Sequence, residues 1–317
     1  MSVVCSCDTG GGNTGRPGCF GVFDVTVQVI LVSYRKPDGS INGIDLSTLS
    51  AGGTILDQTD LDNLVRDINP KTRFYPTQNL KNITDVRADD INEEFEDTSS
   101  VFIQQGARSF EGMIIKGDPI LLGNLQSWRC QTTGVFFIDK SGNLIGDASV
   151  DGFLNPVLIQ DDSFSAGLVL GTDTTKQKIM LKFIISQLFS DNNLGMIEGQ
   201  SITAALKGVS GLVDVIAETP TGISTTEFTV QLNTKYGGVL SPIAAEGLQL
   251  SDFAMTEVTP TPGPIVISSV TESSSVAGLY TFVFPTQTSA DLLRISNPLA
   301  GPLSKNLDLV SFDVTIP

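Results

Sequence analysis

The residues with the most reactive side chains stand at the start of the chain. Three of the four cysteines, Cys5, Cys7 and Cys19, fall within the glycine-rich segment CSCDTGGGNTGRPGCF, and the fourth is Cys130. Four thiolates satisfy the tetrahedral coordination of zinc, but the C-x-C spacing lacks the usual C-x₂₋₄-C pair. We therefore expect no metal and no cofactor, and we keep a zinc site made by these four cysteines as the alternative.

The same segment could also bind phosphate or form a disulfide, and its sequence favours neither. A Walker-type phosphate loop needs Gly-Lys-Ser/Thr before a helix, and a dinucleotide loop must follow a strand. The stretch TGGGNTGRPG has neither context. A disulfide is disfavoured because thiols stay reduced in the cytosol, where we expect this chain. Glycine-rich backbone is costly to order, so we expect residues 1–21 to be an assembly segment that orders against a neighbouring copy.

Seven carboxylates follow one another along a single extended stretch. They lie in ITDVRADDINEEFED, residues 83–97, a predicted strand that forms a hairpin with a second one over Val101–Ile115. A glycosidase needs two carboxyl groups in separate environments within a cleft, whereas a continuous acidic run is typical of a charged surface. A two-stranded ribbon is marginal by itself, so we expect this hairpin to pair at a subunit interface. Its candidate residues are Asp85, Arg87, Asp89, Asp90, Glu93, Glu94, Glu96, Asp97 and Arg108.

Histidine is absent from the chain. Its absence removes the commonest general acid–base group, the Ser-His and Cys-His nucleophile pairs and most catalytic zinc sites. The Asp139–Asn143 stretch resembles a calcium loop only faintly, because it lacks the acid spacing and closing glutamate of an EF-hand. We therefore expect that the protein is not an enzyme.

The charge balance limits the partners of the chain. Nineteen basic and 35 acidic residues give a net charge of −16, and so acidic a chain does not bind nucleic acid through lysine–phosphate contacts. No signal peptide is evident, and no apolar run reaches the ~18–20 residues of a membrane span. We expect a cytosolic protein without a membrane partner, which could surround nucleic acid without binding it.

Hydrophobic periodicity predicts a mainly β chain with few helices. Alternating residues predict a strand over Val22–Tyr34, and an apolar face at helical spacing predicts a helix over Thr59–Ile68, capped by Thr59. Asp118 followed by Pro119 predicts the start of a second helix. Residues 22–208 are therefore predicted to form an α+β domain, a β-barrel or β-sandwich with two helices.

Beyond residue 200 the composition becomes rich in Thr, Ser and Pro. About seven short predicted strands in about a hundred residues, without a helix signal, are the pattern of an immunoglobulin-like sandwich. We therefore predict that residues 209–317 form an all-β immunoglobulin-like domain that folds alone.

Several segments resemble the tail tube proteins of tailed bacteriophages. The resemblance covers Arg73–Gly146, which begins RFYPTQNLKNITDVRADDIN, and the segment GNTGRPGC at Gly12–Cys19. The segments EGLQLSDFAMTEV and SVTESSSVAGLYTFVFPTQTSADLLRIS are similar to the immunoglobulin-like domain often fused to such virion proteins. The resemblance makes residues 22–208 a tail-tube-like β domain.

This resemblance implies a structural virion protein whose copies form stacked hexameric rings. Each copy would contribute its hairpin to an inner β-barrel, which leaves no strand edge free. Its partners would be other copies, other phage tail proteins, and DNA that passes through the lumen without specific binding. Its location would be the virion tail, after assembly in the host cytoplasm.

Two alternatives remain open beside the tail tube. One is another virion protein, such as a capsid decoration or sheath protein. The other is a glycan-binding, adhesin-like protein, which is disfavoured because the C-terminal domain has no tryptophan and only Tyr236 and Tyr280 as tyrosines.

Overall fold

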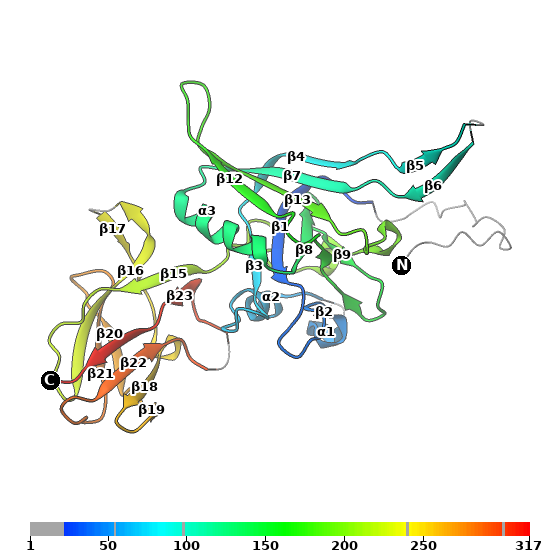
Figure 1. Ribbon diagram of the computed structural model, residues 1–317. Coiled ribbons are helices and arrows are strands. Elements are labelled where there is room, and N and C mark those ends of the chain that lie inside the picture. The colour runs from blue at the N-terminus through cyan, green and yellow to red at the C-terminus, as the bar shows by residue number, and fades with distance from the viewer. Residues whose placement is uncertain (1–21, 54, 97–98, 239–240, 300–301) are drawn as a thin grey trace.

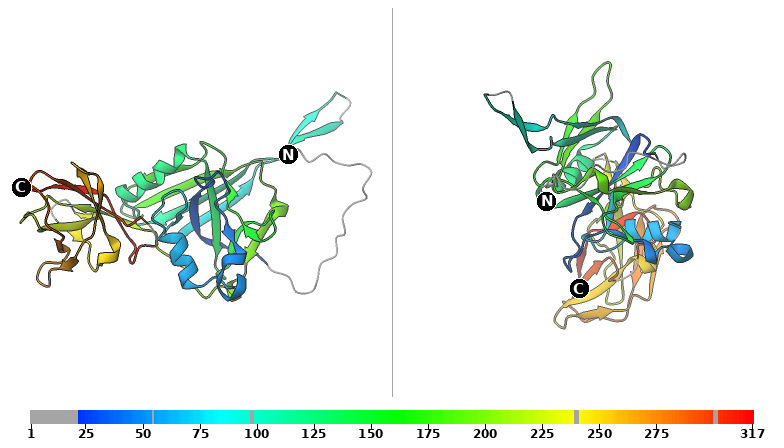
Figure 2. Two further views of the ribbon diagram at one scale, coloured as in Figure 1. Left: turned by 90° about the horizontal axis from the view of Figure 1, so that it is seen from below. Right: turned by 90° about the vertical axis from the view of Figure 1, so that its right-hand side faces the viewer.

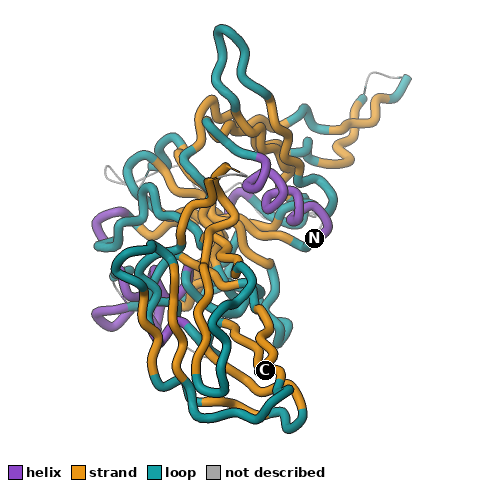
Figure 3. The backbone as a smooth tube through the Cα atoms, turned by 90° about the vertical axis from the view of Figure 1, so that its left-hand side faces the viewer, coloured by secondary structure: helices purple, strands orange, loops and turns teal. Residues whose placement is uncertain are grey.

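Strands dominate the computed structural model, which describes residues 22–53, 55–96, 99–238, 241–299 and 302–317 (Figure 1, Figure 3). The predicted mainly β fold class is confirmed. The helices are α1 (Ser50–Gly53), α2 (Gln58–Val65) and α3 (Pro119–Gln126). The strands up to residue 197 are β1 (Thr26–Ser33), β2 (Ile44–Asp45), β3 (Phe74–Pro76), β4 (Leu80–Arg87), β5 (Ile91–Glu94), β6 (Ser100–Gln104), β7 (Arg108–Ile115), β8 (Thr133–Asp139), β9 (Leu144–Asp147), β10 (Phe153–Leu154), β11 (Val157–Leu158), β12 (Ser165–Val169), β13 (Lys178–Ile185) and β14 (Leu194–Ile197). The later strands are β15 (Val213–Ala217), β16 (Glu227–Gly238), β17 (Ser241–Ala244), β18 (Ala254–Thr259), β19 (Gly263–Ile265), β20 (Ser269–Glu272), β21 (Leu279–Val283), β22 (Leu292–Ser296), β23 (Leu307–Leu309) and β24 (Phe312–Thr315).

Two stacked sheets form the N-terminal part. The first has the order β14-β9-β8-β1-β3, with β11 also beside β8, and the second has the order β12-β13-β7-β4. Strand β1 is apolar on both faces, so it contributes to two cores. Val29 and Leu31 belong to the core shared with the second sheet, whereas Ile30 and Val32 belong to the core that includes Leu61 of α2. The first sheet is therefore the middle layer of this part.

The second sheet buries only one of its faces. Phe110 of β7 and Phe183 of β13 stack with ring centroids 4.9 Å apart, and both belong to the core between the two sheets. Leu125 of α3 and Trp128 just after it join the same core. The residues that alternate with these along β7 and β13 are half-buried or exposed. One face of this sheet is consequently left for solvent or for a partner.

The two predicted helices are present as α2 and α3, but α2 begins and ends earlier in the chain than predicted. Asp57 caps α2 instead of Thr59, because its carboxylate accepts a hydrogen bond from the Asp60 N–H in a capping box. The helix ends at Val65, before the predicted end at Ile68: its C-cap Arg66 leaves the helical conformation, and the Arg66 carbonyl accepts a hydrogen bond from the N–H of Leu303. The predicted start of α3 at Asp118–Pro119 is confirmed. Within the described ranges, no helix is long and apolar enough to cross a membrane.

The C-terminal part is a two-sheet β-sandwich. One sheet has the order β20-β21-β16-β15-β23, with β17 also beside β16, and the other has the order β19-β18-β22-β24. Phe228 and Phe282 of the first sheet stack at 4.9 Å, and they share one core with Leu293 and Ile295 of the second. This core is separate from the two N-terminal ones.

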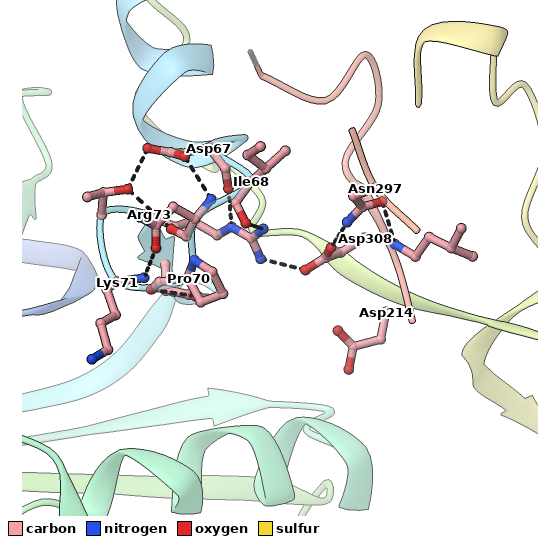
Figure 4. A network of polar contacts seen from close by, with 12 residues as sticks. Asp67, Ile68, Pro70, Lys71, Arg73, Asp214, Asn297 and Asp308 are labelled. Carbon is pink, nitrogen blue, oxygen red and sulfur yellow. Dashed lines mark hydrogen bonds and ion pairs between the residues drawn. The ribbon is translucent and has the colours of Figure 1, made fainter. Parts of the chain in front are cut away.

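A polar network joins the two parts (Figure 4). Arg73 is only 4% exposed, and its Nη1 lies 2.5 Å from the Asp308 carboxylate of the sandwich. The same guanidinium donates to the carbonyls of Asp67 and Ile68. The carboxylate of Asp308 also accepts a hydrogen bond from Asn297. A buried arginine therefore fixes the C-terminal sandwich against the N-terminal part.

Candidate assembly surface

The predicted hairpin over Ile83–Ile115 is divided into two structures. Its base, β4 and β7, belongs to the second sheet, where β7 pairs with β13 along its whole length. The prediction that this hairpin lacks a partner in its own chain is therefore wrong for the base. The outer portion, β5 and β6, forms a separate two-stranded sheet that projects from the body (Figure 1, Figure 2). We call residues 88–107 the hairpin arm.

The hairpin arm exposes large apolar side chains. Five of them are about half exposed, between 46% and 57%: Ile91, Phe95, Val101, Phe102 and Ile103. A two-stranded sheet is marginal in water, and an exposed apolar group of this size indicates an interaction surface. The polar residues of the first strand do not indicate this surface; its signal in the sequence is the run of consecutive apolar residues 101–103 in the second strand.

Carboxylates lie among these apolar side chains. The register places Glu93 opposite Val101 and Asn92 opposite Phe102, so each face of the arm carries both polar and apolar groups. Asp89, Glu93, Glu94 and Glu96 are exposed, and within the described ranges their carboxylates have no hydrogen-bond or ion-pair partner. Asp90 accepts a hydrogen bond from the Gly106 N–H at 2.9 Å, and Asp97 lies outside the described residues.

Gly106 allows the chain to change direction between arm and base. The strands are interrupted at residues 88–90 and 105–107. A Cβ atom at Gly106 would lie 1.8 Å from the carbonyl oxygen of Ala88, so only glycine lets the two backbones approach so closely. A glycine inside a predicted strand is a known sign of such an approach, and it would have located this break.

The other three candidate residues form an ion-pair network at the base of the arm. Arg108 donates from Nε to Asp85 at 2.8 Å and from Nη1 to Asp191 at 2.8 Å. Arg87 forms an ion pair with the same Asp191. The hydrogen bonds from Arg108 to Asp85 raise the pKa of its guanidinium, which stays charged. Asp191 was not a candidate, because no local pattern links it to residues about a hundred positions earlier.

Asp191→Asn is expected to loosen the hairpin arm without unfolding the protein. The substitution leaves both arginines without their shared negative charge, but the pairs are partly exposed, so the loss should be about 1 kcal/mol or less. Hydrogen–deuterium exchange should show faster exchange across residues 83–110. Asp161→Asn, at an exposed turn, is the matched control. Unchanged exchange in the arm would contradict a restraining role for the network.

A groove of about 550 Å³ lies between the arm and the segment that contains Asp191. Its apolar lining includes Phe102, Ile103, Leu188 and Phe189, and Leu188 is 75% exposed. The apolar surface of the arm therefore continues onto the body of the protein.

The second sheet ends in two strands that have a partner on one side only. β12 pairs with β13, and β4 pairs with β7, and in the described part of the chain neither has a second neighbouring strand. Open edges of this kind present unpaired backbone groups to another chain.

The structure tests only one of the four cysteines. Cys130 follows α3 at the end of a short 3₁₀ turn, and its side chain is exposed. Cys5, Cys7 and Cys19, with the whole assembly segment 1–21, lie outside the described residues. Elsewhere in the chain as described, no group of three or more Asp, Glu, Cys or His side chains is arranged to hold a metal ion. The zinc alternative stays a prediction.

Comparisons with protein-family models, with curated proteins and with solved structures found no match.

Proposed function

We propose that the chain is a structural virion protein, a tail tube subunit. By analogy with the family, its copies associate into hexameric rings that stack around a bore for DNA. In this proposal it has no catalytic role. It binds other copies and other tail proteins, and DNA passes through without specific binding. It assembles in the host cytoplasm and resides in the virion tail.

The hairpin arm is the observation that carries the proposal. It is long, projects from the body and has exposed apolar side chains on both strands. A monomer gains nothing from exposing these groups, whereas burial of a large apolar side chain in an interface contributes about 1.5–3 kcal/mol. The arm is therefore suited to reach a neighbouring copy.

The edges of the second sheet support a closed ring. If β12 of one copy pairs with β4 of the next, the sheets continue around the ring, and closure leaves no edge free. The net charge of −16 favours a passage over a binding site for DNA, since the summed field of the protein repels phosphate. The C-terminal sandwich, which we propose is immunoglobulin-like, lies away from this sheet (Figure 1) and is expected to face outward.

Electron microscopy of the purified chain tests the proposal. Rings or hollow tubes are expected by negative stain, together with high-mass species by size-exclusion chromatography with light scattering. A variant that ends after Lys207 should still assemble, into thinner tubes. A chain that stays monomeric at high concentration would exclude the tail tube and the sheath, and would favour a glycan-binding protein.

A further inference from the structure

The open face of the second sheet, the one turned away from the core, is basic in an acidic protein. The registers place three lysines on this face, Lys81 of β4 with Lys178 and Lys182 of β13, together with one carboxylate, Glu111 of β7. Lys182 and Glu111 form an ion pair at 2.5 Å. Within the described ranges, Lys81 and Lys178 have no ion-pair partner, so each copy presents two uncompensated positive charges here.

The surface between these two lysines is apolar. Met113 lies opposite Lys81, Ile115 lies opposite Lys178, and Met180 lies beside Met113 on the next strand. Thioether and hydrocarbon groups donate no hydrogen bond to an anion. The strands of Lys81 and Lys178 flank β7, so they are about 10 Å apart. The face therefore carries separated cations rather than a cluster that could hold one anion tightly.

The proposed ring makes this face the wall of the bore. When β12 of one copy pairs with β4 of the next, the sheets close into a barrel. Phe110 and Phe183 point from the other face into the core, and the C-terminal sandwich lies outward, so the open face lines the passage. Each copy then repeats its two unpaired lysines around the bore. The acids of the hairpin arm lie beyond the end of the sheet (Figure 1, Figure 2), not on this wall.

We propose that Lys81 and Lys178 contact the phosphate backbone of DNA as it passes through the bore. This inference rests on the proposed tail tube function. Exposed charges more than about 8 Å apart are largely screened at physiological salt, so a phosphate at the wall is attracted mainly by these lysines. The net charge of the chain had indicated repulsion alone, but strand pairing gathers lysines on the one face that DNA would meet.

These contacts favour passage over retention. Lysine–phosphate contacts carry no sequence information and let a protein and DNA slide past each other. Two such contacts per copy are few, and the net charge of −16 opposes accumulation of DNA. DNA also suits the wall better than an acidic polypeptide does, because a duplex carries one negative charge per about 1.7 Å of its length.

Retention of DNA inside assembled tubes tests these contacts. Tubes are assembled with a short fluorescent DNA duplex, treated with nuclease to remove DNA outside them, and sedimented. At about 50 mM salt, tubes of the unaltered chain are expected to hold protected duplex, and those of the double variant Lys81→Gln, Lys178→Gln about tenfold less. Raising the salt to about 200 mM should release the duplex from unaltered tubes, because counterions then compete with the lysines.

Two double variants provide controls. Lys71→Gln with Lys305→Gln changes the net charge by the same amount at exposed positions outside the second sheet, and it should retain duplex like the unaltered chain. Lys81→Arg with Lys178→Arg keeps both positive charges and should also retain it. If the double glutamine variant forms no tubes, each single glutamine variant takes its place, with an expected loss of about threefold.

The outcomes separate this inference from the proposed function. Unaltered tubes that hold no protected duplex at low salt, or equal retention by the glutamine variant and its control, would overturn the inference. Tubes that retain a polyglutamate probe but no DNA would overturn it too, because the lysines would then suit an acidic polypeptide. A chain that forms no tubes at all would instead overturn the proposed function.

Discussion

The double substitution Phe102→Glu, Ile103→Glu is expected to abolish self-association of the chain and to leave its thermal stability unchanged. Both side chains are more than half exposed, at 57% and 56%, so they contribute little to the folded monomer. In an assembly they would be buried, and two carboxylates cannot enter an apolar interface without a large desolvation penalty. An effect confined to assembly is the signature of an interface residue.

Light scattering and negative-stain microscopy measure this result directly. Val266→Glu is the matched control, because Val266 is 79% exposed on the C-terminal sandwich and has no part in the proposed contact. It should assemble like the unaltered chain. Tubes formed by the double variant would show that the hairpin arm is not an assembly element.

The substitution Asp308→Ala is expected to cost about 3 kcal/mol of unfolding free energy, because it leaves a buried arginine without its counter-ion. Arg73 keeps its hydrogen bonds to the carbonyls of Asp67 and Ile68, but these groups do not neutralise its charge. The network is one polar link between the two parts of the chain, beside Arg66, which donates to the side chain of Asn306 and to the carbonyl of Ser304. We therefore expect the N-terminal part and the sandwich to unfold separately in the variant.

Differential scanning calorimetry distinguishes the outcomes. The unaltered chain should unfold with coupled transitions, and the variant with two resolved ones, the first at a lower temperature. Asp313→Ala is the control, since it removes a partner from the exposed Arg294–Asp313 pair, and exposed pairs contribute little. A variant that unfolds like the unaltered chain would mean that the link depends on other contacts.

The amino-acid sequence determined the features that depend on neighbouring residues. Asp118 and Pro119 began α3 because a capping side chain and a proline act within one turn. The mainly β fold class followed from alternation and turn residues, which act over a few positions. The predicted limits of α2 were wrong by a few residues: Asp57 caps the helix in place of Thr59, and the helix ends at Val65, before the Arg66 carbonyl that accepts a hydrogen bond from the N–H of Leu303.

The tertiary structure decided which charged residues lie close to one another. The sequence grouped Asp85, Arg87 and Arg108 with the acids of one hairpin. In the structure, Arg87 and Arg108 also bind Asp191, which lies 104 and 83 positions further along the chain. Likewise, only strand pairing places Lys81 and Lys178 on one face of the sheet, because their distance along the chain says nothing about register. Electrostatic contacts act through space over a few ångströms, whereas sequence patterns act along the chain. Local patterns therefore predict the helices and strands, whereas the charged surfaces are known only from how these elements pack.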